Sequence, residues 1–134
     1  MTRGLRNNNP GNIRHDGTRW QGEIIPSTDF AFKQFKTMAY GYRAMLKLLR
    51  NYALLHHCYT IRTMVSRWAP PSENDTKSYI TTVAKIAGID PDRRIDIYDR
   101  HLMCALAGAM NRVENGTSAV MADVEAGWDL LRSE

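Results

Sequence analysis

The chain has only two cysteines among its 134 residues, Cys58 and Cys104. Both lie in segments of helical, partly apolar sequence, so we expect buried free thiols rather than a disulfide. His56 and His57 adjoin Cys58 instead of standing at the intervals that zinc ligands require. The sequence therefore predicts neither a metal site nor another cofactor.

Long apolar runs are also missing. The longest one is far shorter than the roughly 20 residues that a membrane-spanning helix needs. No apolar segment follows Met1 to Gly4, so we expect no Sec-type signal peptide and no membrane span. A net charge of +4 and a pI near 9.3 favour an anionic partner, which could be nucleic acid, an acidic membrane face or a bacterial wall polymer.

The sequence shows no internal repeat, low-complexity tract or linker, and its length suits one domain over residues 1–134. Apolar residues recur at helical spacing from residue 37 onward, between capping and breaking residues. The helices that we expect cover residues 38–56, 60–68, 75–88, 99–114 and 118–131.

Residues 1–36 have no helical period. Phe30 to Phe35 alternates as a strand does, and Trp20 to Ile25 could pair with it as a small hairpin. We therefore predict an α+β fold, mostly α, with a small N-terminal β wing.

Glu114 is the strongest candidate for chemistry. It follows Met110 by four residues, next to an apolar helical stripe that ends at Asn115-Gly116. Such a glutamate can simply be exposed at a helix end. If it is buried on one side, it can stay protonated near neutral pH and donate that proton to a glycosidic oxygen.

Other side chains could complete such a site. Tyr79, early in its helix, is either a core tyrosine or a phenol that points into a cleft. Trp20, with Gln21 beside it, could stack on a sugar face or anchor the hairpin. The second acidic group could be Glu23, Asp29 or Asp16, or each of these could be solvated.

A basic cluster at the front of the chain raises nucleic-acid binding as an alternative. Aromatic residues do not interleave with these arginines as they do in single-strand binders, so we expect no nucleic-acid partner. The cluster consists of Arg3, Arg6, Arg14 and Arg19.

Several motifs together resemble a family of phage and prophage lysozyme-like proteins, over nearly the whole chain. That family opens with an R-G-x-R-N-N-N-P-G-N-I-R run, continues through R-W-A-P-P-x-E-N-D-T-x-x-Y and finishes with E-N-G. The matching residues are Arg3 to Arg14, Trp20 and Gly22, Phe32 and Phe35, Gly41 to Tyr52, Ile61 to Tyr79, and Glu114 to Gly116.

The same segments are similar to bacterial glucosaminidases and lytic transglycosylases of the lysozyme-like superfamily. In those enzymes a helix that ends in a catalytic glutamate precedes the Asn-rich segment, whereas here only six residues precede Asn7. The Glu114 helix comes last instead, so the resemblance implies a circularly permuted lysozyme-like domain. Chain termini commonly lie close together at the surface, which makes such a rearrangement mild.

The resemblance implies cleavage of peptidoglycan glycan strands in the bacterial periplasm or cell wall, by a phage-encoded or delivered protein that could work with virion or secretion-system components. The implied catalytic residues are Glu114 as general acid, Tyr79 and Glu23. The implied substrate-binding residues are Asn9, Asn12, Ile13, Arg14, Trp20, Gln21 and Asp75.

Two questions stay open at this point. A second carboxylate at about 6.5–9.5 Å from Glu114 would favour an inverting hydrolase, and its absence would favour a lytic transglycosylase. The alternative to both is a non-catalytic wall-binding or virion structural module.

Overall fold

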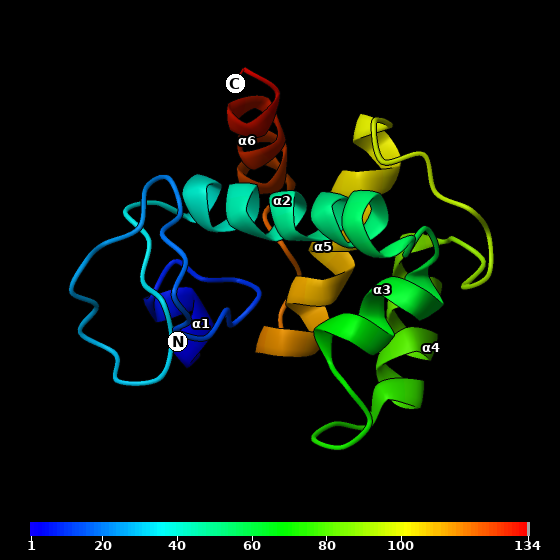
Figure 1. The fold of residues 1–134 in the computed structure, drawn as a ribbon, viewed down its shortest axis with the longest axis horizontal. Coiled ribbons are helices and arrows are strands. Elements are labelled where there is room, and N and C mark those ends of the chain that lie inside the picture. Colours follow the sequence, from blue (N-terminus) through cyan, green and yellow to red (C-terminus); the bar gives the residue numbers. More distant parts are fainter. Residues whose placement is uncertain (134) are drawn as a thin grey trace.

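The computed structural model describes residues 1–133, and this part of the chain is mostly helical (Figure 1). Its helices are α1 (Arg3–Arg6), α2 (Met38–His56), α3 (Ile61–Trp68), α4 (Thr76–Ala87), α5 (Arg100–Asn115) and α6 (Met121–Arg132). No helix within residues 1–133 is both long enough and apolar enough to cross a bilayer.

The predicted starts of four helices are confirmed by their caps. Each N-cap side chain accepts a hydrogen bond from a backbone N–H of the first turn, which satisfies a donor that the helix itself cannot. These caps are Thr37, Thr60, Asp75 and Asp99. Gly88 and Gly116 end α4 and α5 in the left-handed conformation that favours glycine.

One helical boundary and one additional helix differ from the prediction. α6 begins at Met121 rather than Ser118, and its N-cap Val120 makes no side-chain capping bond. The short helix α1 was not predicted, because one turn is too brief to show a helical period. Thr2 caps α1, because its hydroxyl accepts a hydrogen bond from the Leu5 N–H. Gly4 is the buried residue of this helix.

The predicted β wing is replaced by an irregular segment over residues 7–37, which we call the N-terminal loop. Within residues 1–133 the only β pairing is two isolated bridges, Arg14–Phe32 and Glu23–Phe35. The backbone groups of residues 31–36 bond in turn to Asn7, to residues 13–15 and to residues 22–24. Because these bonds are divided among three segments, no continuous two-stranded ladder forms.

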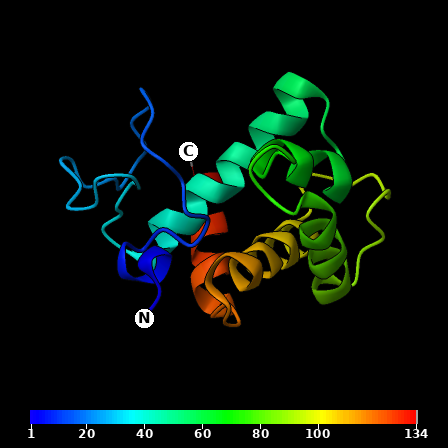
Figure 2. The same cartoon turned by 90° about the horizontal axis from the view of Figure 1, so that it is seen from below.

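Helix α2 runs across the molecule, with the N-terminal loop at its beginning and α3 and α4 near its end (Figures 1 and 2). Apolar residues from all five longer helices form one core around it. α6 crosses α2 closely at Gly127, where an added Cβ would lie 2.6 Å from Tyr42 Cβ and 2.8 Å from the Arg43 backbone nitrogen. The backbone of α2 cannot move away without disturbing the core.

We expect Gly127→Ala to destabilise the fold by about 1–3 kcal/mol through overpacking. This sign is opposite to the gain of about 1 kcal/mol that alanine usually gives in a helix. Urea unfolding measures the effect. Gly108→Ala in α5 is the matched control, because its new Cβ would meet the flexible Met121 side chain at 3.1 Å and Ala119 Cβ at an ordinary contact distance of 3.5 Å. Equal effects of the two substitutions would contradict the prediction.

Candidate functional site

Glu114 lies one residue before the end of α5, half-buried, between two neutral hydrogen-bond donors. Asn12 Nδ2 donates to Glu114 Oε1 at 2.9 Å, and the Tyr79 hydroxyl donates to Glu114 Oε2 at 2.9 Å. The donors come from the N-terminal loop and from α4. Three segments far apart in the sequence therefore fix the direction of one carboxyl group, and each oxygen keeps a second lone pair for another partner.

The end of α5 is fastened to the beginning of the chain by Asn115. Its buried amide nitrogen donates to the Pro10 carbonyl at 2.8 Å, and its oxygen accepts from the Thr2 hydroxyl at 2.8 Å. Gly4 allows this approach, because a Cβ there would lie 2.5 Å from Asn115 Oδ1 and 2.6 Å from Asn12 Oδ1. Asn12 itself has a φ of 51°, a left-handed conformation that asparagine tolerates better than most residues.

Tyr79 is buried, and its pKa is raised above the usual value. The main cause is burial, followed by the negative charge of Glu114 and the hydrogen bond to it. The phenol therefore keeps its proton throughout the neutral range and acts as a donor to Glu114, not as a base.

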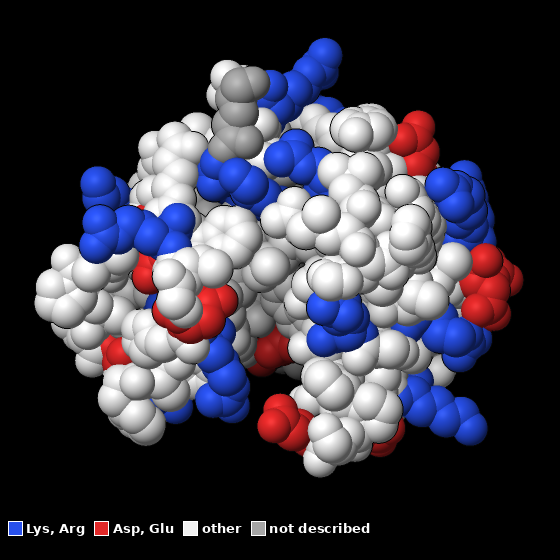
Figure 3. All heavy atoms as spheres, in the orientation of Figure 1, with Lys and Arg blue, Asp and Glu red and all other residues white. Residues whose placement is uncertain are grey.

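Two surface hollows meet at Glu114. The first has a volume of about 430 Å³ and lies between the N-terminal loop and the α3 end, and the second, of about 720 Å³, lies between α4 and α5. Glu114 and Asn74 line both. Figure 3 shows the surface hollowed between the N-terminal loop on the left and α3 and α4 on the right. We call the two hollows together the Glu114 groove.

Four of the predicted substrate-binding residues line the Glu114 groove. Asn12, Ile13 and Arg14 line the first hollow, and Asp75 lines the second while also capping α4. The structure thus brings the Asn-rich segment and Tyr79 to the same carboxyl group, as the sequence interpretation required.

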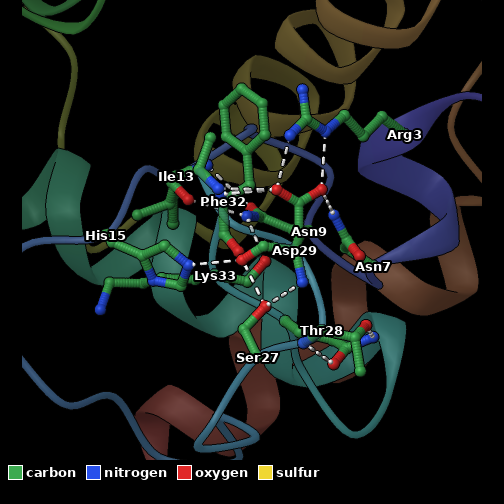
Figure 4. Close-up of polar contacts among 12 residues, drawn as sticks. Arg3, Asn7, Asn9, Ile13, His15, Ser27, Thr28, Asp29, Phe32 and Lys33 are labelled. Carbon is green, nitrogen blue, oxygen red and sulfur yellow. Dashed lines mark hydrogen bonds and ion pairs between the residues drawn. The ribbon is translucent and has the colours of Figure 1, made fainter.

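Asn9 is placed differently from the prediction. It is fully buried, and its side chain bonds to both the N–H and the carbonyl of Ile13 and to the carbonyl of Lys33 (Figure 4). Because these hydrogen bonds occupy the buried side-chain amide of Asn9, the amide cannot contact a ligand. Trp20 and Gln21 also line neither hollow; Trp20 packs against the core and Gln21 is exposed.

Glu23, predicted as a second catalytic carboxylate, forms an internal ion pair. Its side chain is 4% exposed and lies 3.2 Å from the ammonium of Lys33, which is itself only 1% exposed. Glu23 Oε1 also accepts from the Trp20 backbone N–H at 3.0 Å. These contacts keep the carboxylate inside the N-terminal loop and out of the Glu114 groove.

Asp29 is likewise occupied. Its two oxygens accept from Arg3 Nε and Nη2 at 2.6 and 2.7 Å, and it also binds Asn7 and two backbone N–H groups (Figure 4). Chiefly the Arg3 hydrogen bonds, and then those from the Ala31 N–H and Asn7, hold the pKa of Asp29 well below its usual range. The carboxylate therefore ties α1 to the loop that carries Asn12.

A carboxyl group with a lowered pKa in the fold stabilises the fold above its unfolded-state pKa, near 4, and this stabilisation is lost as the pH falls below that value. We expect the Tm of the parent protein to fall between about pH 4 and pH 2 more steeply than that of Asp29→Asn. The variant should be less stable at neutral pH, with the difference shrinking in acid. Parallel Tm curves over this range would contradict the assignment.

The sequence interpretation missed the aromatic wall of the first hollow. Tyr52 of α2 and Trp68 at the end of α3 line it, with ring centroids 6.3 Å apart in an edge-to-face arrangement. Both lie at helical spacing among apolar residues, a pattern that also fits a purely structural role in the core. The available signal was the position of Trp68, which comes just before the Pro70-Pro71 helix stop and therefore at a surface edge.

The cysteines and possible metal ligands add no further site. Cys104 is buried and Cys58 partly buried, and both are free thiols, as predicted. Across residues 1–133 no three His, Cys, Asp or Glu side chains gather in a way that could hold a metal ion.

The chain belongs to a phage protein family. The chain is 39% identical over 124 residues to Protein P5 of Pseudoalteromonas phage PM2, an alignment that spans 90% of this chain and 76% of the relative. No protein-family model matches the chain. At this identity and coverage the chain belongs to the family of Protein P5, and the expected relationship to bacteriophage is confirmed.

Proposed function

We propose that this protein cleaves the glycan strands of peptidoglycan, with Glu114 as the general acid. The observation that carries the proposal is the position of the Glu114 carboxyl group, held by Asn12 and Tyr79 at the point where two hollows meet. A polymer that lies along both hollows would place an internal linkage at this carboxyl group. Cleavage inside a chain requires this arrangement.

The chemistry assigned to Glu114 has two steps. The protonated carboxyl group gives its proton to the glycosidic oxygen as the bond from that oxygen to the sugar C1 breaks, and positive charge develops at C1. The resulting carboxylate then takes the proton of the C6 hydroxyl of the same muramic acid, whose oxygen attacks C1 and closes a 1,6-anhydro ring. Tyr79 and Asn12 keep the carboxyl group in one orientation through both steps.

This single-carboxylate route is a lytic transglycosylase reaction, and we favour it over hydrolysis. An inverting hydrolase needs a second carboxylate to activate water. Glu23 instead pairs with Lys33, and Asp29 pairs with Arg3 of α1. Asp16 lines the first hollow but bonds to Thr18 and pairs with Lys33 at 3.2 Å.

We further propose that the fold is a circularly permuted lysozyme-like domain. The contacts of Asn115 with Thr2 and Pro10 support this, because they put the end of the glutamate helix beside the start of the Asn-rich segment. In an unpermuted chain those two segments would be joined directly. The family of Protein P5 would then be a phage branch of wall-cleaving proteins that act in the periplasm or cell wall.

Digestion of purified, peptide-bearing peptidoglycan followed by mass spectrometry tests the function. We expect soluble muropeptides that end in 1,6-anhydromuramic acid. Reducing ends would replace the transglycosylase assignment by a hydrolase and would identify the sugar at the cleaved bond. Binding to the wall polymer without any soluble product would overturn the enzymatic proposal in favour of a wall-binding or virion structural module.

Tyr79→Phe tests the orienting role of the phenol. The substitution removes one of the two donors to Glu114 while keeping the buried ring, so we expect turnover to fall on the order of a hundredfold through misplacement of the acid. The initial rate of muropeptide release measures it. Tyr59→Phe, which changes a tyrosine outside both hollows, should leave that rate unaltered, and full activity of Tyr79→Phe would remove the phenol from the mechanism.

A further inference from the structure

A second pair of cavities flanks the exposed side chain of Tyr98, in the segment between α4 and α5. One has a volume of about 400 Å³ and lies between α2 and α6, and the other, of about 360 Å³, lies beside the end of α2. Both share Ile97 and Tyr98, and neither has a lining residue in common with the Glu114 groove. We call this region the Tyr98 surface, made up of Arg50, Leu54, Arg94, Tyr98, Leu131 and Arg132.

The Tyr98 surface is apolar at its centre. Tyr98 is 68% exposed and Leu54 48% exposed, although both are large hydrophobic residues that usually pack inside. Leu46, Ile97 and Leu131 line the first cavity. An exposed tyrosine and leucine beside an open apolar cavity mark a place that another apolar surface can cover.

An unsatisfied donor lies in the wall of the same cavity. Trp128 is 8% exposed, and its indole Nε1 has no hydrogen-bond partner among the residues that the structure describes. The nitrogen itself has almost no accessible surface, so the indole contributes its apolar ring to the cavity wall. The cavity therefore offers a ligand mainly apolar walls.

Arginines surround this apolar centre. Arg50 and Arg132 line the first cavity, and Arg94 lines the second, where its guanidinium stacks 3.9 Å from the Tyr59 ring centroid. Among residues 1–133, Asp96 is the single acidic side chain in the two linings, and it accepts from the Tyr98 backbone N–H. Figure 3 shows Lys and Arg side chains gathered over the junction of α6 and α2, next to uncharged surface.

We propose that the Tyr98 surface docks the protein onto a lipid bilayer that contains anionic headgroups. Tyr98 and Leu54 enter the boundary between headgroups and acyl chains, and Arg94 and Arg132 pair with the phosphates. Nucleic acid would satisfy the arginines but would leave the exposed Tyr98 and Leu54 without an apolar partner, so charge and apolarity together favour the membrane.

Vesicle flotation with the full chain tests docking. We compare vesicles of phosphatidylcholine alone with vesicles that also contain phosphatidylglycerol, at low and high salt. The parent should float with the anionic vesicles and release at high salt. Arg132→Gln should lower the partition coefficient about fivefold, and Tyr98→Ser combined with Arg132→Gln should reduce it below detection.

Matched controls lie on the N-terminal loop. Phe30→Ser removes another exposed aromatic residue and Arg19→Gln another exposed arginine, both outside the Tyr98 surface, and each should bind as the parent does. Equal losses from Arg19→Gln and Arg132→Gln would overturn the proposal, since the attraction would then be a general effect of positive charge. Failure to float with anionic vesicles, or salt-sensitive DNA binding in its place, would also overturn it. Circular dichroism confirms that each variant is folded.

Discussion

Glu114→Gln is expected to release no measurable muropeptide, a loss of about 10²–10⁴-fold for removal of a general acid. Glutamine keeps the size of the side chain and can still accept one hydrogen bond from Asn12 or Tyr79, but it has no acidic proton to give to the leaving oxygen. The rate of soluble muropeptide release from peptidoglycan, with protein concentration held constant, measures the loss.

The controls for this substitution are the two other carboxylates that line the first hollow. Asp16→Asn and Glu73→Gln remove the same charge from the same part of the surface. If Glu114 acts alone, both variants should keep activity close to that of the parent. If one control lost as much activity as Glu114→Gln, the substituted carboxylate would be the second catalytic group. The protein would then be assigned as an inverting hydrolase.

Glu23→Gln should instead act on stability. It leaves the Lys33 ammonium, 1% exposed, without its buried partner. Breaking a buried ion pair from one side costs about 3–5 kcal/mol, and we expect the lower end of this range because Asp16 and the Thr18 carbonyl also contact the ammonium. The urea midpoint measures the loss.

The double variant Glu23→Gln, Lys33→Met separates the structural role from a catalytic one. Removing the ammonium removes the unpaired charge, so stability should return towards that of the parent. Activity, measured where the double variant is folded, should return with it. A double variant that is stable but inactive would show that Glu23 takes part in catalysis, against the structure.

The helices could be predicted from the sequence because their signals are local. Thr37, Thr60, Asp75 and Asp99 are each followed by an apolar pattern of helical period, and a cap acts within a single turn. The start of α6 was misplaced because Val120 caps it without a side-chain bond, which leaves no signal in the sequence.

The N-terminal loop could not be predicted in the same way, because long-range contacts form it. The alternation at Phe30 to Phe35 was read as one strand of a hairpin, yet its backbone bonds go to three separate segments. Asn9 and Glu23 look like candidate ligand contacts in a polar run. Only the fold shows that Asn9 bridges Ile13 and Lys33, and that Glu23 neutralises a buried ammonium.

The meeting of Glu114, Asn12 and Tyr79 follows from the motifs read together, although they span more than one hundred residues. The resemblance implies that the Asn-rich segment, Tyr79 and Glu114 belong to one site. The aromatic wall formed by Tyr52 and Trp68 was not found, because an apolar stripe does not tell which of its members lie at the rim of a cavity.

The link from Asn115 to Thr2 and Pro10 has a practical consequence. The orientation of the Glu114 carboxyl group can be lost without a loss of helical content. Breaking this link would move Asn12 away from the carboxyl group while α2 to α6 stayed folded. A preparation can therefore give an unchanged far-ultraviolet spectrum and still have lost its site.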